Sequence, residues 1–420
     1  MRHLIINAAQ LLTMAGPDRP RRGAELRSVG LVRQGAVLVE NGRILAAGPR
    51  DLVQAHGAAG TARLLDAGGR VVLPGFVDSH SHPVFAAARL QDFVARLQGR
   101  TYAQIAAEGG GILSTVKGVR GATVSELADG LRTRAAKFLE CGTTTLEAKS
   151  GYGLDLESEL KMLRAVKAAA EAGPLELVAT FLGAHAVPGE MKHDREGYVR
   201  RVCEEMIPAV AREGLATFVD VFCEGGFFTV EESARIFAAG AKAGLKPKIH
   251  AEQLSRSGSL PLAVKAGAVS ADHLDCVDES DLALLAGSDT VACLVPGSNY
   301  FLAKPYPPAR GLVDAGAAVA LATDFNPGTC PCWDMRTIMS IACTQMKMTL
   351  EEVLVAATVN GAWALGLGRT HGSLEPGRRA DLVCYEAEDY REIPYHFGAP
   401  EVAWTMKNGA MVHSRQEYKL

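Results

Sequence analysis

The alternation of strand-like and helix-like segments limits the possible folds of this chain more than any other feature. Short apolar runs such as 219–222 (VDVF) and 319–323 (VALAT) recur, and each is followed by a segment with helical apolar spacing. Strands that are apolar on both faces are typical of parallel sheets covered by helices. Eight such units over roughly 300 residues predict an α/β fold, a (β/α)8 barrel of the TIM type.

The expected boundaries follow from the same pattern. We expect strands at 71–77, 143–147, 177–182, 217–223, 247–250, 268–272, 290–295 and 318–323. We expect helices at 124–139, which starts from a capping box at Thr123, and at 157–172, 198–213, 230–243, 279–286, 309–315 and 335–346. The segment 83–122 interrupts this rhythm, and we interpret it as a long active-site loop. Its Gly109-Gly110-Gly111 run lacks the lysine of a phosphate-binding loop.

The two ends of the chain have a different pattern, with short strands and tight turns. Asn41-Gly42 and Asn408-Gly409 each separate two strand-like runs, which is a strong hairpin signal. We therefore expect residues 1–66 and 371–420 to form one small β-sandwich-like domain, with the barrel occupying residues 67–370.

Composition excludes several classes of protein. The formal net charge of -3 argues against a nucleic-acid surface, and we find no apolar run of the roughly 18 residues that a membrane helix needs. Asn7, Gln10 and Thr13 interrupt the N-terminal apolar stretch, which argues against a secretion signal. The nine cysteines are scattered, and the only close pair is Cys330 and Cys332, so we expect reduced thiols and a cytoplasmic protein.

Polar residues that follow the strands form a selective set. His80 and His82 follow the first strand, and i and i+2 on an extended segment share one face. The later strands end in His185, His250, His273 and Asp324. Because barrel active sites lie at the carboxyl ends of the strands, these side chains should converge. The other histidines are interpreted as structural or exposed: His3, His56, His193, His371, His396 and His413.

Three imidazoles and one carboxylate suit a zinc or iron site that keeps a position for water. A metal lowers the pKa of its water to about 7 and so supplies a nucleophile at neutral pH. His273 is then available to orient that water or to polarise the attacked carbonyl, and Asp324 can accept a proton. Glu147 and Lys149 offer no obvious bridge to a second ion, so we expect one metal.

These motifs resemble the metal-dependent amidohydrolase superfamily. Segments 108–116 (EGGGILSTV), 149–154 (KSGYGL) and 324–328 (DFNPG) resemble, more narrowly, its imidazolone-ring hydrolases of histidine degradation. That resemblance covers nearly the whole chain. It implies hydrolysis of 4-imidazolone-5-propanoate to N-formimidoyl-L-glutamate, by attack of a metal-bound water on the cyclic amide C–N bond, and a homodimer.

The resemblance also implies roles for individual residues. The metal ligands would be His80, His82, His250 and Asp324, holding one Zn²⁺ or Fe³⁺ per chain. The catalytic residues would be His273 and Asp324. The substrate contacts would be Arg89, Tyr102, Tyr152, His185, Gln253, Asn326, Gly328 and Thr329, with the guanidinium of Arg89 binding the propionate carboxylate.

Some alternatives stay open. Strand alternation places Glu252 on the face of His250, whereas the family pattern favours Gln253 as the substrate contact. A related deaminase could use the same metal, but Arg89 and Tyr152 argue for an anionic substrate. Another alternative is a barrel that has lost catalysis and serves as a binding or assembly module. Such a protein should also have lost metal-site residues, whereas His80, His82, His250, His273 and Asp324 are all present.

Overall fold

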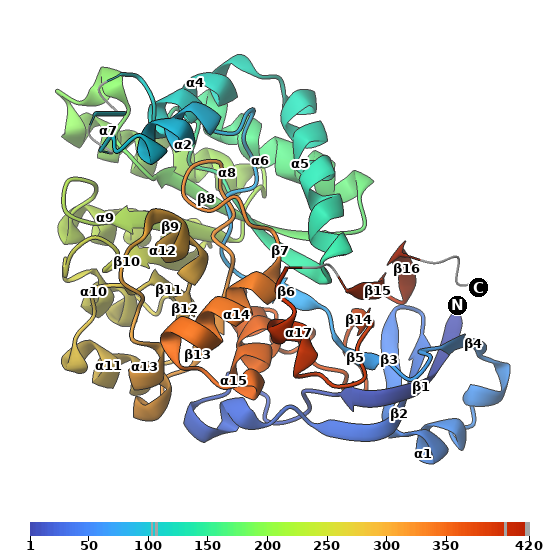
Figure 1. Ribbon diagram of the computed structural model, residues 1–420. Coiled ribbons are helices and arrows are strands. Elements are labelled where there is room, and N and C mark those ends of the chain that lie inside the picture. The colour runs from blue at the N-terminus through green and yellow to red at the C-terminus, as the bar shows by residue number, and fades with distance from the viewer. Residues whose placement is uncertain (102–103, 106–107, 399–400, 416–420) are drawn as a thin grey trace.

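The computed structural model describes residues 1–101, 104–105, 108–398 and 401–415 (Figure 1). Tyr102, an expected substrate contact, lies outside the described residues. Eight parallel strands form one sheet in the order β6 to β13, which confirms the predicted barrel. These are β6 (Phe76–Asp78), β7 (Thr143–Lys149), β8 (Glu176–Ala184), β9 (Phe218–Cys223), β10 (Lys246–Ala251), β11 (Ser270–His273), β12 (Val291–Leu294) and β13 (Val319–Leu321).

The segments that follow β6 and β13 bring the two ends of this sheet together. Ser81 and Phe325 form a parallel bridge. The amide of Asp324 donates to the carbonyl of His80 over 3.0 Å, and the amide of His82 donates to the carbonyl of Phe325 over 2.7 Å. The nearly closed barrel therefore places the residues after its first strand directly beside those after its last.

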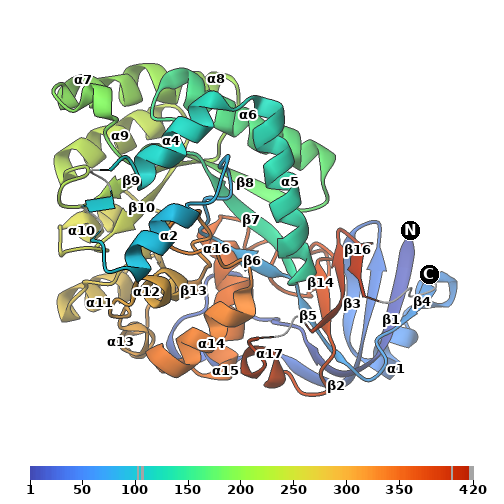
Figure 2. The same cartoon turned by 45° about the horizontal axis from the view of Figure 1, so that its top comes forward.

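Helices surround the strands (Figure 2). Those that the apolar spacing predicts are α5 (Val124–Glu140), α6 (Leu156–Ala172), α7 (Arg195–Arg201) with α8 (Ile207–Arg212), α9 (Val230–Lys242), α11 (Glu279–Ala286), α13 (Ala309–Ala315) and α14 (Met335–Met346). The capping box at Thr123 is present. The helix expected at 198–213 is divided by a π-helical turn, Val202–Met206. Shorter helices are α1 (Arg50–Gln54), α15 (Leu350–Val355), α16 (Gly361–Ala364) and α17 (Glu392–Tyr395).

The interpretation of 83–122 as a loop throughout is wrong. The segment contains α2 (Leu90–Leu97) and α4 (Ile112–Gly121). The glycines at 118 and 121 lower helix propensity and mask the apolar spacing of α4. Two further helices, α10 (Ser259–Lys265) and α12 (Pro296–Leu302), were also not expected. Pro261 in the first turn of α10 and Pro296-Gly297 at the start of α12 are typical of turns and weaken the helical pattern.

The chain ends form a second eight-stranded sheet of mainly antiparallel strands. It contains β1 (Arg2–Leu12), β2 (Leu31–Glu40), β3 (Arg43–Pro49), β4 (Arg63–Asp66), β5 (Val71–Pro74), β14 (Leu382–Tyr385), β15 (Val402–Lys407) and β16 (Ala410–Ser414). Both Asn-Gly turns connect hairpins as expected, with Asn41 and Asn408 at positive φ. Val37, Val72 and Trp404 share one buried core, so the two ends of the chain pack together.

The chain crosses from the end sheet to the barrel sheet at Gly75, between β5 and β6. β5 pairs with β1 and β14 in the end sheet, although a boundary at residue 67 assigns it to the barrel, whereas β6 pairs with β7. A side chain at Gly75 would collide with Thr144. The division into domains otherwise stays a prediction. In the described part of the chain, no helix is both long and apolar enough to cross a membrane.

Candidate metal centre and substrate cavity

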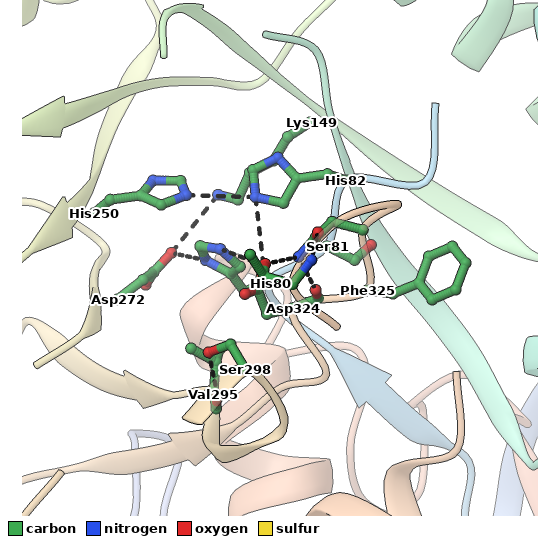
Figure 3. A network of polar contacts seen from close by, with 12 residues as sticks. His80, Ser81, His82, Lys149, His250, Asp272, Val295, Ser298, Asp324 and Phe325 are labelled. Atoms are coloured by element: carbon green, nitrogen blue, oxygen red, sulfur yellow. Dashed lines mark hydrogen bonds and ion pairs between the residues drawn. The ribbon is translucent and has the colours of Figure 1, made fainter. Parts of the chain in front are cut away.

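The four expected metal ligands lie together at the carboxyl end of the barrel (Figure 3). The Nε2 atoms of His80 and His82 lie 3.7 and 3.6 Å from Oδ1 of Asp324. Nε2 of His250 lies 3.4 Å from Nε2 of His82. The segments after β6 and β13 meet where the barrel closes, and the end of β10 lies elsewhere in the sheet. Together they supply these side chains, as the i, i+2 spacing and the barrel predict.

Carboxylates orient two of these imidazoles. Nδ1 of His80 lies 2.6 Å from Oδ2 of Asp272, and Nδ1 of His250 lies 3.2 Å from Oδ1 of Asp220. A carboxylate at Nδ1 holds the proton there and leaves the Nε2 lone pair for a metal. Among the described residues, the buried Nε2 of His80 has no hydrogen-bond partner. The donor set therefore fits a divalent or trivalent ion.

The protonation states agree with that fit. Burial lowers the pKa of His80 and His82 well below the ordinary value, which keeps both imidazoles neutral as ligands must be. Burial raises the pKa of Asp324 to about 8. A cation beside Asp324 would favour the ionised carboxylate.

A buried layer of charges lies beneath the ligands. Nζ of Lys149 lies 2.6 Å from Asp220 and 2.9 Å from Glu147, and Nζ of Lys248 lies 3.0 Å from Glu147. Burial opposes the charge of Lys149, but Asp220, Glu147 and Asp272 raise its pKa. Glu147 and Lys149 are thus engaged with one another in this layer. The expectation of a single metal stays a prediction.

The backbone around Asp324 is held in an unusual shape. Asp324 has φ 52, and the Asp78 carboxylate accepts from the amide and hydroxyl of Thr323 over 3.0 and 2.6 Å. Asn326 holds the following turn: its Oδ1 accepts from the amides of Gly328 and Thr329, and its Nδ2 donates to Asp324 O and Thr329 Oγ1. All four hydrogen-bonding positions of the Asn326 side chain are therefore used within the turn.

A cavity of 510 Å³ opens above the candidate metal ligands. Expected site residues that line it are His82, Arg89, Tyr152, His185, His250, Gln253, His273, Asp324, Asn326 and Thr329. The structure adds several polar residues that sequence reasoning missed: Arg96, Asp275, Ser298, Asn299 and Lys304. Two guanidinium groups, those of Arg89 and Arg96, therefore line the same cavity.

Arg89 and Arg96 belong to the start and end of α2. The Arg89 guanidinium packs against Gly328, where an added Cβ would collide with it. Nη2 of Arg96 donates to the carbonyl of Gly328 over 2.9 Å, and its guanidinium lies 5.0 Å from the centre of the Phe301 ring. Gly328 therefore contributes to the site by leaving room for the Arg89 guanidinium. Arg96 follows Arg89 by seven residues, which is about two helical turns, and this spacing could have predicted that both side chains lie on one face of a helix.

Two rings pack beside the ligands. His185 stacks on His82 at 5.3 Å, and Tyr152 lies 5.4 Å from His185. Nδ1 of His185 lies 3.0 Å from the carbonyl of Gly151, so its Nε2 is the acceptor. Burial lowers the pKa of His185 to about 3. The carboxylate of Glu159 holds this loop by accepting from the amides at 151, 153 and 154.

The structure separates Glu252 from Gln253. Gln253 lines the cavity, whereas the Glu252 carboxylate accepts from Ser257 N, Ser259 Oγ and Leu260 N over 2.6–3.0 Å. Glu252 has φ 51, which ends the alternation of the strand at the residue before it. Strand alternation from His250 therefore does not predict which of the two residues faces the cavity. The Glu252 side chain instead accepts hydrogen bonds at the start of α10.

His273 ends β11 with φ 80 and lies beside the ligands. Its ring centre is 5.2 Å from that of His80 and 5.3 Å from that of His250. Burial lowers its pKa well below the ordinary value. A neutral His273 can donate from one ring nitrogen and accept at the other.

Fold, ligand set and cavity together define a metal-dependent hydrolase barrel. The model of the amidohydrolase family matches residues 71–412, and the chain belongs to that family. Its relatives place it more narrowly, among the imidazolonepropionases. The imidazolonepropionase of Shouchella clausii is 45% identical over 96% of this chain and 91% of its own length, and that of Solibacter usitatus is 45% identical over 98% of both.

Solved structures agree on the fold. An adenosine deaminase from Xanthomonas campestris with bound zinc has a TM-score of 0.72 at 20% identity, and the match covers 99% of this chain and 93% of that one. At this identity the likeness concerns the fold alone.

Proposed function

We propose that this protein hydrolyses 4-imidazolone-5-propanoate to N-formimidoyl-L-glutamate. The observation that carries the proposal is one cavity with two guanidinium groups, Arg89 and Arg96, beside a cluster of neutral histidines. A cationic wall suits the propionate carboxylate, and the histidine cluster suits hydrolysis. The 45% identity to imidazolonepropionases over nearly the full chain supports the same reaction on a cyclic amide.

His80, His82, His250 and Asp324 would hold one Zn²⁺ or Fe³⁺. A metal supplies Lewis acidity and lowers the pKa of a water molecule to about 7. His273 would polarise the ring carbonyl by donating a hydrogen bond, and Asp324 would take the proton from the attacking water and return it to the leaving nitrogen. This uses Asp324 in the ionised form, which burial alone disfavours.

The remaining cavity residues would bind substrate. Arg89 would bind the propionate, and Tyr152, His185 and Gln253 would contact the ring. Thr329 lies at the cavity wall, and Asn326 and Gly328 shape the turn beneath Arg89. Tyr102, which lies outside the described residues, is proposed to contact the substrate from the same segment as Arg89.

Turnover of 4-imidazolone-5-propanoate, followed by loss of ring absorbance, tests the proposal. We expect about one zinc or iron per chain by elemental analysis, and a loss of activity of about 10²–10⁴-fold in His273→Ala. Arg89→Ala should raise KM by tenfold or more because a charge-assisted pair is lost. The control is Arg391→Ala, a residue on the exposed surface. Full activity without metal, or a deaminated product from a neutral ring, would refute it.

We also propose a cytoplasmic homodimer. The nine cysteines are free, which suits a reducing compartment. Sedimentation of the purified protein tests the dimer, and a monomer at micromolar concentration would refute it.

A further inference from the structure

Two hydrogen-bond acceptors in the cavity have no role in the site described above. Asp275 lies two residues after His273, and Asn299 lies on α12; both line the cavity. Among the described residues, Oδ1 of Asp275 and Oδ1 of Asn299 are buried atoms without a hydrogen-bond partner. Asn299 is only 2% exposed. Buried acceptors are nearly always matched by donors, so this pair selects for a ligand that carries N–H groups.

The orientation of Asn299 is fixed by the loop that follows α12. The side-chain Nδ2 of Asn299 donates to the carbonyl of Pro305 over 2.6 Å, and the backbone carbonyl of Asn299 accepts from the amide of Lys304 over 2.9 Å. A flipped amide would set Oδ1 against the carbonyl of Pro305, so Oδ1 is the end that stays available. Asn299 is thus held as an acceptor.

The charges in the cavity are divided between two kinds of group. Arg89 and Arg96 present donors, whereas Asp275 and Asn299 present acceptors. Lys304 also lines the cavity. Burial raises the pKa of Asp275 to about 7, whereas a side-chain hydrogen bond with Asn299 and the charge of Lys304 lower it, so one carboxylate oxygen is engaged with Asn299 and Oδ1 remains for a ligand. The cavity therefore offers guanidinium donors and unpaired acceptors to the same ligand, and it suits a molecule that carries both a carboxylate and N–H donors.

We propose that Asp275 and Asn299 form a subsite for the amidine group of the ligand. This inference rests on the proposed function. Hydrolysis adds the hydroxyl of water to the ring carbonyl carbon, breaks its bond to nitrogen and gives that nitrogen a proton. The N–C–N unit of the ring thereby becomes the formamidinium group of N-formimidoyl-L-glutamate. A carboxylate and an amide oxygen accept from such a cation through charge-assisted hydrogen bonds.

Calorimetry on the metal-loaded protein tests this subsite with two ligands. N-formimidoyl-L-glutamate carries the amidinium, and N-formyl-L-glutamate replaces it with a neutral formyl group on the same skeleton. We expect the wild type to bind the first ligand about tenfold or more tightly than the second, because hydrogen bonds to charged groups are the stronger ones. Asp275→Asn keeps the shape of the side chain and should reduce this ratio to about one.

Two further variants sharpen the experiment. Asn299→Ala should lower the ratio by about threefold, the smaller effect of a neutral acceptor. Asp289→Asn, an exposed aspartate outside the cavity, should leave the ratio unchanged. The affinity for N-formyl-L-glutamate reports whether each variant keeps a folded site.

The outcomes separate this subsite from the proposed function. Equal binding of the two ligands by the wild type, binding of neither, or a wild-type ratio in Asp275→Asn would each overturn the subsite. If instead the wild type fails to open the imidazolone ring, while its ligand ratio is present and disappears in Asp275→Asn, the proposed reaction is refuted and the amidine subsite stands.

Discussion

Gly151 shows how one backbone position sets two rings in the cavity wall. It has φ 103, and a Cβ there would lie 2.9 Å from the carbonyl of Leu182 and 3.0 Å from Nδ1 of His185. Its carbonyl is also the hydrogen-bond partner of the His185 ring. The glycine therefore permits the close contact that keeps His185 stacked on His82.

Gly151→Ala should displace His185 and lower kcat/KM by roughly 10- to 100-fold, since shifts of about 1 Å in a site cost that much. Steady-state kinetics with 4-imidazolone-5-propanoate measures the effect. Gly377→Ala is the matched control: it also has positive φ, 88°, but no atom lies within 4 Å of the added Cβ in the described structure. Equal losses in the two variants would show that backbone strain, rather than His185, is responsible.

At this scale, the sequence predicts residues that directly end strands and misses those that depend on tertiary contacts. His80, His82, His250 and Asp324 could be predicted because the barrel itself sets their positions. Asn299 could not, because its burial and its bond to Pro305 depend on how α12 and its loop fold over the cavity. No spacing in the sequence reports that contact.

At the scale of elements, β10 and α10 meet at a single buried carboxylate. Glu252 leaves the strand at φ 51 and accepts three hydrogen bonds around the first turn of α10. Gln253 then points into the cavity. Glu252 thus stabilises the connection between β10 and α10, and the side chain of Gln253 is available to a ligand.

Glu252→Gln and Gln253→Ala should have opposite signatures. Glu252→Gln removes charge-assisted bonds and should lower the free energy of unfolding by about 1.5–3 kcal/mol, with KM nearly unchanged. Gln253→Ala should raise KM with little change in melting temperature. Urea denaturation and steady-state kinetics are measured on both variants, and each variant is the control for the other. A large KM effect of Glu252→Gln with normal stability would instead identify Glu252 as the ligand contact.

The elements themselves were predictable to different degrees. The barrel strands include short apolar runs, and the longer helices carry apolar residues at helical spacing, so both were predicted. The apolar residues of α2, Leu90, Phe93, Val94 and Leu97, have the same spacing, yet in the structure they stay partly or largely exposed. The helix was missed because the long segment around it was interpreted as a single loop.

At the scale of the whole molecule, a buried cluster joins the barrel to the end sheet. Nζ of Lys407, in β15, lies 2.7 Å from Glu176 at the start of β8 and 2.6 Å from Asp381. Nε2 of His371 lies 3.0 Å from Glu176. His371, interpreted from the sequence only as structural or exposed, is one of the residues that hold the two sheets together. The contacts of Glu176 were not visible in the sequence because it lies 195 positions from His371 and 231 positions from Lys407.

This cluster predicts a specific dependence of stability on pH. Burial opposes the charge of Glu176, but His371 and Lys407 lower its pKa well below the ordinary value of 4.5. A lowered pKa in the folded state stabilises the protein fully above the unfolded pKa, and this contribution is lost as the pH falls below about 4.5. Glu176→Gln should therefore cost about 2 kcal/mol at pH 7, less than the ~3–5 kcal/mol of a fully buried pair because Glu176 is partly exposed.

The cost should shrink as the pH falls through about 4.5, because the unfolded wild type then binds a proton at Glu176 that the folded protein, with its lowered pKa, does not bind. Urea denaturation between pH 3.5 and 7 measures the difference between the two proteins, with Glu171→Gln, an exposed residue of α6, as the control. The difference itself is the diagnostic quantity, because loss of metal in acid affects both proteins alike. A constant difference over that range would show that Glu176 stabilises the junction by packing alone, and the ion pair with Lys407 would then have no measurable part in joining the two sheets.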